Sequence, residues 1–231
     1  MTGRVAIVTG GAGALGSAVS RQFLSAGGTV CIPYVVPEEV ERLRAQTKPE
    51  QNARLHPEHV DVLDEQAFQA FVDRTRERHR RIDALVNIMG GFAGGDLAST
   101  SLAEWRRMMD LNLTSVVIAC RAVLPAMTAA RYGRIVSISS RAVVPPAGGF
   151  IAYTVSKAGV LTLTQALAQE VKPHGITVNA VLPSTMDTEA NRTAMPDADR
   201  SGWVSPDAVA GVIALLASEE AGAISGAGIS V

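Results

Sequence analysis

Residues 4–16 read RVAIVTGGAGALG and join a short apolar run to a glycine-rich turn. The run up to Thr9 is typical of a buried strand, and residues 14–26 predict an amphipathic helix. Glycines between a strand and a helix let backbone N–H groups approach a phosphate at the positive helix end. Such turns also serve packing alone, so this one is by itself a weak sign of a dinucleotide site.

The same alternation of strand and helix continues along the chain. Further strands are predicted at 29–34, 82–88, 134–140, 176–182 and 227–231. Another strand, the third in the chain, is predicted to end at 60–62. Helices are predicted from Pro37, at 64–80, at 102–130 with a bend near Pro125, at 150–171 and from Ser205. This order predicts one α/β domain over residues 1–231, a Rossmann-type, doubly wound, mostly parallel sheet with helices on both faces.

Composition narrows the class of protein. The net charge is −1 and basic residues are spread along the chain, so we expect no nucleic-acid partner. No apolar run is long enough to cross a bilayer and no signal-peptide pattern is present, so we expect a cytoplasmic protein without a membrane partner. His56 and His59 flank a proline without further ligands, and no metal site is expected.

Tyr153 and Lys157 are four residues apart in a predicted helix, which places a phenol and an ammonium on one face. A positive charge beside a tyrosine favours the phenolate and lowers its pKa toward the working range. Each residue also has a structural explanation, a core ring for Tyr153 and a solvated charge for Lys157. If the pair faces a cofactor, it predicts the acid–base centre of an enzyme.

Over nearly its whole length the sequence resembles the short-chain dehydrogenase/reductase family. Thr9, Gly10 and Gly16 match the family's glycine motif, while Ala14 replaces its middle glycine. The family's Asn-Asn-Ala-Gly appears as residues 87–90 with Ile88 in place of the second Asn. The resemblance implies an NAD(P)-dependent oxidoreductase that interconverts a carbonyl and an alcohol by hydride transfer.

The resemblance also assigns roles to particular residues. Tyr153 is implied as acid and base, Lys157 as the residue that lowers its pKa and holds the nicotinamide ribose, and Ser140 as the holder of the substrate oxygen. Asn112 is implied to anchor a water that links Lys157 to solvent. The residues implied to contact the cofactor are Gly10, Ala14, Leu15, Gly16, Tyr34, Asp61, Val62, Asn87, Ile88, Gly90, Tyr153, Lys157, Pro183, Met186 and Thr188.

The choice between NAD and NADP stays open at this point. Tyr34 stands where a carboxylate would bind the ribose 2′-OH and repel a 2′-phosphate. The glycine turn carries no arginine to clamp a phosphate, although Arg42 and Arg44 on the next helix are candidates.

The substrate is expected to be a small, apolar molecule. Residues 184–204 predict a substrate lid with Met195 and Trp203, and Phe92, Val144 and Phe150 lie on neighbouring loops. These side chains could equally pack the lid on the body. Residues 90–95 and the lid segment are similar to dihydropteridine reductase, a divergent relative in the family, which makes pterin reduction an alternative.

Two other interpretations remain. A 3-oxoacyl-thioester reductase is a second enzymatic alternative. A non-catalytic dinucleotide-binding or sensing module is the alternative of another class, favoured by the altered glycine and Asn-Asn-Ala-Gly motifs. The resemblance further implies a homo-oligomer, with a tetramer favoured, and the apolar surplus at 161–167 fits a covered second face on the helix that carries Tyr153.

Overall fold

The computed structural model describes all residues, 1–231, and contains one seven-stranded parallel sheet. The strand order β3-β2-β1-β4-β5-β6-β7 reverses its direction between β1 and β4, as in doubly wound folds. The strands are β1 (Val5–Thr9), β2 (Thr29–Tyr34), β3 (Leu55–His59), β4 (Ala84–Asn87), β5 (Gly133–Ile138), β6 (Ile176–Leu182) and β7 (Gly228–Ser230). The predicted fold class is confirmed.

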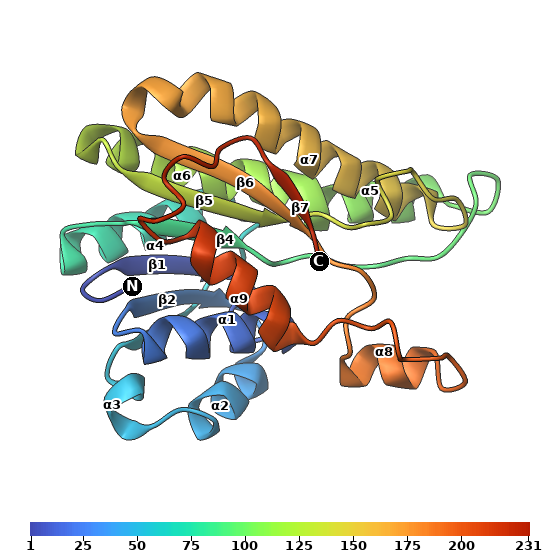
Figure 1. Cartoon of the computed structure of the whole chain (residues 1–231), viewed down its shortest axis with the longest axis horizontal. Helices are drawn as coiled ribbons and strands as arrows, with labels where there is room; N and C mark the ends of the chain where they lie inside the picture. Colours follow the sequence, from blue (N-terminus) through green and yellow to red (C-terminus); the bar gives the residue numbers. More distant parts are fainter.

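Helices cover both faces of the sheet (Figure 1). The helices are α1 (Ala14–Ser25), α2 (Pro37–Ala45), α3 (Pro49–Asn52), α4 (Glu65–His79), α5 (Leu102–Met109), α6 (Ser115–Ala130), α7 (Ile151–Val171), α8 (Glu189–Ala194) and α9 (Pro206–Leu216). Residues of α4, α6 and α7 share one hydrophobic core with the sheet, and residues of α1, α2 and α9 share the other. The strands are therefore buried on both sides, which explains their nearly continuous apolar sequences.

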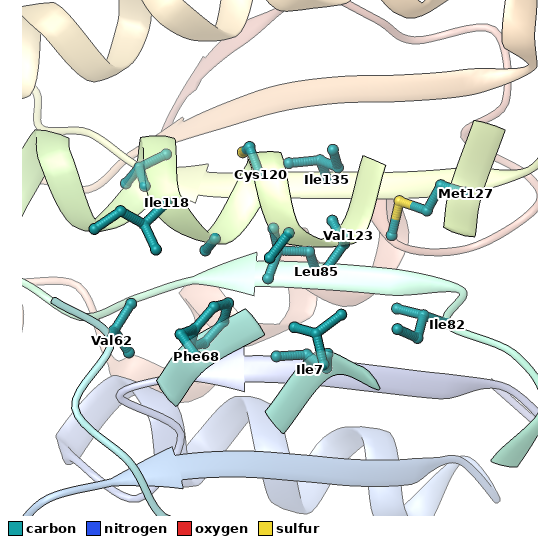
Figure 2. Close-up of a cluster of buried hydrophobic side chains, with 14 of the residues drawn as sticks. Ile7, Val62, Phe68, Ile82, Leu85, Ile118, Cys120, Val123, Met127 and Ile135 are labelled. Carbon is teal, nitrogen blue, oxygen red and sulfur yellow. The ribbon is translucent and has the colours of Figure 1, made fainter. Parts of the chain in front are cut away.

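The core on the α4 and α6 face is made of large side chains from both layers (Figure 2). Ile7, Leu85 and Ile135 rise from three adjacent strands and are fully buried. Phe68 of α4 and Val123 of α6 pack over them and are also fully buried. Removing a ring such as that of Phe68 from such a core costs about 3–5 kcal/mol. This packing holds the strand ends, and thus the site, in place.

One local prediction was wrong. The third strand was expected to end at Val60–Val62, but β3 is Leu55–His59 and contains Pro57. Proline is tolerated there because β3 is an edge strand whose only neighbour is β2. The backbone N–H of Val60 still bonds the carbonyl of Tyr34 at 2.9 Å, so the chain follows β2 for only one more residue.

The long helix over Leu102–Ala130 was expected to bend near Pro125, which lies inside α6. A feature that the sequence did not predict is a π-helical turn, η1 (Asp110–Thr114), between α5 and α6. By length and composition this helical run could span a membrane, but η1 packs against α7 while α6 packs against α4 and the sheet. Residues of α6 thus belong to a hydrophobic core of the protein, and η1 places Asn112 in the protein interior.

Candidate active site

Four loops meet beyond the carboxyl ends of the adjacent strands β1, β4, β5 and β6, where ligands bind in open parallel sheets. The loops after β4 and β5 and the segment with α8 gather at the right-hand end of Figure 1. The first turns of α7 lie against the loop after β4, because the backbone of Gly95 bonds that of Gly149 and Ile151 at 2.8 and 3.0 Å.

The glycine turn after β1 leaves no room for side chains. Gly10 has a φ of +65°, and a Cβ on it would lie 2.9 Å from the backbone nitrogen of Met89. A Cβ on Gly16 would overlap the carbonyl oxygen of Gly10. The Thr9 hydroxyl accepts the N–H groups of Ile88 and Met89 at 3.2 and 3.4 Å, which joins the ends of β1 and β4.

The N-terminus of α1 offers unpaired donors to a ligand. Its N-cap, Gly13, provides no side-chain hydrogen bond, and the first turn has no acidic residue. Ala14, which replaces the middle glycine of the motif, is exposed, whereas Leu15 is buried and anchors the helix. Free N–H groups at a positive helix end fit an anionic pyrophosphate.

Tyr153 and Lys157 are one helical turn apart on α7, as predicted. Lys157 is buried, and its Nζ donates to the carbonyl of Ile138 at 2.8 Å. Burial lowers the pKa of Lys157 to about 8. Burial also raises the pKa of Tyr153, and a hydrogen bond with Ser140 opposes that rise. The prediction that Lys157 lowers the pKa of Tyr153 is therefore not met in this arrangement, because burial dominates and the ammonium binds Ile138.

The two serines at the end of β5 have different partners. Ser139 donates its hydroxyl to the backbone oxygen of Lys157 at 2.8 Å, which fixes α7 to the strand. Ser140 accepts the N–H of Ala142 at 3.1 Å, so its own proton is free to point toward Tyr153. Ser140, not Ser139, therefore faces the phenol.

Asn112 is fully buried in the π-helical turn, and both ends of its amide bond protein atoms. Its Oδ1 accepts the N–H of Gly91 at 2.9 Å, and its Nδ2 donates to the Gly91 carbonyl at 3.1 Å and to the Ser156 hydroxyl at 3.0 Å. Ser156 in turn donates to the backbone oxygen of Tyr153 at 2.8 Å. The amide thus joins the loop after β4 to the helix that carries Tyr153.

Gly90 lies inside this cluster. A Cβ on it would lie 2.5 Å from Asn112 Oδ1 and 3.2 Å from Lys157 Nζ. The nearby Asn87 turns its side chain into the sheet, where Nδ2 donates to Ser137 Oγ at 3.1 Å and Oδ1 has no partner. Asn87 and Ile88 therefore present mainly backbone to a ligand, and only glycine fits at position 90.

Three aromatic rings line the approach to the phenol. The ring centroids of Phe92 and Tyr153 are 5.1 Å apart, those of Phe92 and Phe150 5.8 Å, and those of Phe150 and Tyr153 6.1 Å. Phe92 packs against both other rings, yet 62% of it remains exposed to solvent. Exposed Val144 and Met195 lie on the loop after β5 and on the segment with α8. The aromatic group forms an apolar wall beside the hydroxyl of Tyr153.

The predicted lid begins and ends at one short pairing. Asp187 N–H bonds the carbonyl of Val204 at 2.8 Å, and Val204 N–H bonds that of Thr185 at 2.9 Å. Thr188 caps α8, with its hydroxyl accepting the N–H of Asn191 at 3.2 Å. Pro183 is buried and Met186 half-buried at the base of this excursion.

The adenosine end of the site is less enclosed. Tyr34 ends β2 with its ring edge-on to His59 at 5.6 Å, followed by exposed Val35. Asp61 is exposed and its carboxylate accepts the N–H of Leu63 at 2.9 Å, while Val62 is buried. These predicted contacts thus lie at the ends of β2 and β3, with few side-chain bonds among them.

A cavity of about 700 Å³ lies elsewhere, between α4 and the edge strand β3. Arg44, Arg74 and Arg78 line it together with Glu58 and Glu77, so its walls carry both charges. It is remote from Tyr153 and takes no part in the site.

Sequence reasoning missed Ser156 and Gly91. Ser156 is recognisable only as the residue before Lys157, and its bond to Asn112 spans 44 positions.

Comparisons with known proteins agree with this geometry. The model of the short chain dehydrogenase family matches residues 4–199. The chain is 32% identical to acetoacetyl-CoA reductase from Paracoccus denitrificans, over 96% of this chain and 94% of that protein. It is 28% identical to 3-oxoacyl-acyl-carrier-protein reductase from Aquifex aeolicus, over 100% and 96%. The crystal structure of levodione reductase superimposes with a TM-score of 0.91 at 26% identity, covering 100% of this chain and 96% of that one.

The family model matches most of the chain, and the structure has a glycine turn, a buried lysine, and a tyrosine next to a serine at the carboxyl edge of the sheet. The chain belongs to the short-chain dehydrogenase/reductase family, and it is an NAD(P)-dependent oxidoreductase that interconverts a carbonyl and an alcohol.

Proposed function

We propose that Tyr153 is the acid–base residue of this enzyme, with Ser140 and Lys157 in direct support and Asn112 as a positioning residue. The observation that carries the proposal is the position of the Ser140 side chain next to the largely buried phenol of Tyr153, beside an apolar wall and with a buried lysine one turn further along α7. Perturbed groups that converge on an open edge of the sheet are typical of catalytic centres.

The reaction needs one proton and one hydride. The nicotinamide, when bound, supplies or accepts the hydride. Tyr153 Oη donates the proton to the carbonyl oxygen in reduction and removes it from the alcohol in oxidation. Ser140 donates a hydrogen bond to the same oxygen. Its hydroxyl proton is available for this because Ser140 Oγ only accepts a bond from the Ala142 N–H. Lys157, buried one turn from Tyr153 and bonded to the Ile138 carbonyl, holds the nicotinamide ribose.

The cofactor contacts are proposed from the fit of the glycine turn and the free N–H groups of α1. Backbone atoms of Gly10, Ala14, Leu15 and Gly16 hold the pyrophosphate. The remaining contacts follow the strand ends and comprise Tyr34, Asp61, Val62, Asn87, Ile88, Gly90, Pro183, Met186 and Thr188. Residues 184–204, with α8 at their centre, form the proposed lid.

The wall of Phe92 and Phe150 favours an apolar carbonyl, above all a cyclic or aromatic one. An aromatic ring stacked or edge-on against such a pair gains about 0.5–1.5 kcal/mol beyond its buried area. Exposed Val144 and Met195 extend this apolar surface. A 3-oxoacyl thioester is the second candidate, supported by the names of two relatives, the acetoacetyl-CoA and 3-oxoacyl reductases.

The test compares wild type with Tyr153→Phe in NAD(P)H oxidation with aromatic ketones, cyclic diketones, 3-oxoacyl thioesters and quinonoid dihydropterin. We expect the highest kcat/KM for a cyclic or aromatic carbonyl. Tyr153→Phe should lower kcat by about 10²–10⁴ because the proton donor is lost. Cofactor affinity should stay within about twofold, since the ring remains.

Three results would contradict parts of the proposal. Turnover retained in Tyr153→Phe would remove Tyr153 from the chemistry. A higher kcat/KM for the dihydropterin or the thioester would contradict a cyclic or aromatic carbonyl as the substrate. Cofactor binding without turnover of any carbonyl would favour the sensing module.

The enzyme is further proposed to be a cytoplasmic homotetramer. Leu163 is only half-buried, and Ala166, three residues further along the long helix α7, is exposed, so the side of this helix that carries both is available to a second copy. Light scattering should give four times the 24.2 kDa of one chain. A monomer at micromolar concentration would contradict this.

A further inference from the structure

Glu39 lies where the adenosine of the cofactor is proposed to bind. It belongs to the first turn of α2, directly after the end of β2, and its side chain is 37% exposed. Its Oε2 is 3.9 Å from the position that a Cβ on Gly13 would take. Gly13 is the N-cap of α1, so this carboxylate faces the start of the glycine turn's helix.

The carboxylate of Glu39 has little else to bind. It takes part in no hydrogen bond, and its one ionic partner is Arg42, whose Nη2 lies 3.9 Å from Oε1. Arg42 is 66% exposed, and an exposed pair three residues apart in a helix contributes little. The carboxylate is therefore free to accept hydrogen bonds from a ligand that lies against Gly13.

No other acid occupies the end of β2. The strand ends in Tyr34, and exposed Val35 and Val36 follow before α2 begins at Pro37. In dinucleotide-binding folds a carboxylate about 20 residues after the glycine turn binds the ribose 2′-OH and disfavours a 2′-phosphate. Glu39 follows Gly16 by a similar length of chain but from the helix rather than from the strand.

We propose that Glu39 selects NAD over NADP in this enzyme. Its carboxylate accepts hydrogen bonds from the adenosine ribose hydroxyls and repels a 2′-phosphate by like charge. The carboxylate that is missing at Tyr34 is thus provided by Glu39 in the first turn of α2. This inference rests on the proposed cofactor site and adds the choice of cofactor.

Arg42 provides the opposing possibility. If it turned toward a 2′-phosphate, its guanidinium would favour NADP. Its contact with Glu39 is long and largely exposed, so the two residues compete at the same place with opposite consequences. Charge-removing variants at the two positions separate them.

The experiment measures the dissociation constants of NADH and NADPH by fluorescence titration, in the full chain and without substrate. The variants are Glu39→Gln, Arg42→Gln and the matched control Glu38→Gln, an exposed neighbour in the same turn. Wild type should bind NADH at least about tenfold more tightly than NADPH. Glu39→Gln should bind NADPH more tightly and so lose most of the preference for NADH. Glu38→Gln and Arg42→Gln should keep the preference of the wild type.

Equal or tighter binding of NADPH by wild type, or an unchanged ratio in Glu39→Gln, would overturn the role of Glu39 and leave the hydride-transfer function intact. Loss of NADPH binding in Arg42→Gln together with a wild-type preference for NADPH would assign the selection to Arg42. Failure of the folded wild type to bind either nucleotide would overturn both this inference and the proposed function.

Discussion

The two ends of the site are built in different ways. Around Tyr153, side chains hold one another, because Asn112, Ser139, Ser156 and Lys157 each have a buried hydrogen-bond partner. Around the adenosine, the site consists of backbone, glycines and strand ends, and its acids make few bonds. The catalytic end therefore depends on which side chains are present. The nucleotide end depends on glycines, which leave space for the cofactor against the backbone.

The strongest way to break the nucleotide end is Gly16→Ala. The new Cβ would overlap the Gly10 carbonyl, so the turn must open and the phosphate cradle is lost. We expect at least a hundredfold weaker binding of NADH, measured by titration, with the chain still folded by circular dichroism.

At the catalytic end the corresponding change is Gly90→Ala, which places a methyl 2.5 Å from Asn112 Oδ1. Forcing a group into this packed cluster should cost about 1–3 kcal/mol of unfolding free energy and lower kcat at least tenfold. Gly94→Ala is the matched control, since nothing lies within 4 Å of its Cβ position. Equal effects of the two substitutions would show that the cluster is not rigid.

Lys157→Met sharpens the comparison by separating stability from catalysis. Because burial lowers the folded-state pKa of Lys157, protonation favours the unfolded chain, and this penalty is present below about pH 8. It disappears as the pH rises toward the ordinary pKa of lysine, 10.5. The variant should be inactive yet more stable by about 1–3 kcal/mol at pH 7, with the gain fading between about pH 8 and pH 10.5.

Urea unfolding at pH 7 and pH 10 measures that gain. Lys172→Met, which removes an exposed lysine just after α7, should show no such pH dependence. A loss of stability in Lys157→Met at pH 7 would mean that the bond to Ile138 outweighs the cost of burying the charge.

The smallest effect is expected for Ala14→Gly. Ala14 is exposed at the start of α1, so restoring the family's glycine relieves no clash within the protein. The affinity for NADH should change by less than about threefold, while a glycine in the first turn costs the helix about 1 kcal/mol at most. A tenfold gain in affinity would show that the methyl obstructs the phosphate.

Much of the catalytic end could be predicted from the sequence, because helical spacing alone places Tyr153 and Lys157 on one face. Ser140 follows from its place after a predicted strand. The bonds of Asn112 could not be predicted, since they depend on a π-helical turn and on Gly91 from another loop. Pro57 obscured β3, whose tolerance for proline follows only from its place at the sheet edge.

The bond of Asn112 to Gly91 has a consequence for how such an enzyme could diverge. The amide holds only backbone atoms of Gly91, and the next residue, Phe92, points its ring toward Tyr153. Replacing Phe92 therefore alters the shape offered to a substrate while the proton-transfer groups keep their places. Substitutions at this one exposed position could therefore change the substrate preference of related enzymes while hydride and proton transfer are retained.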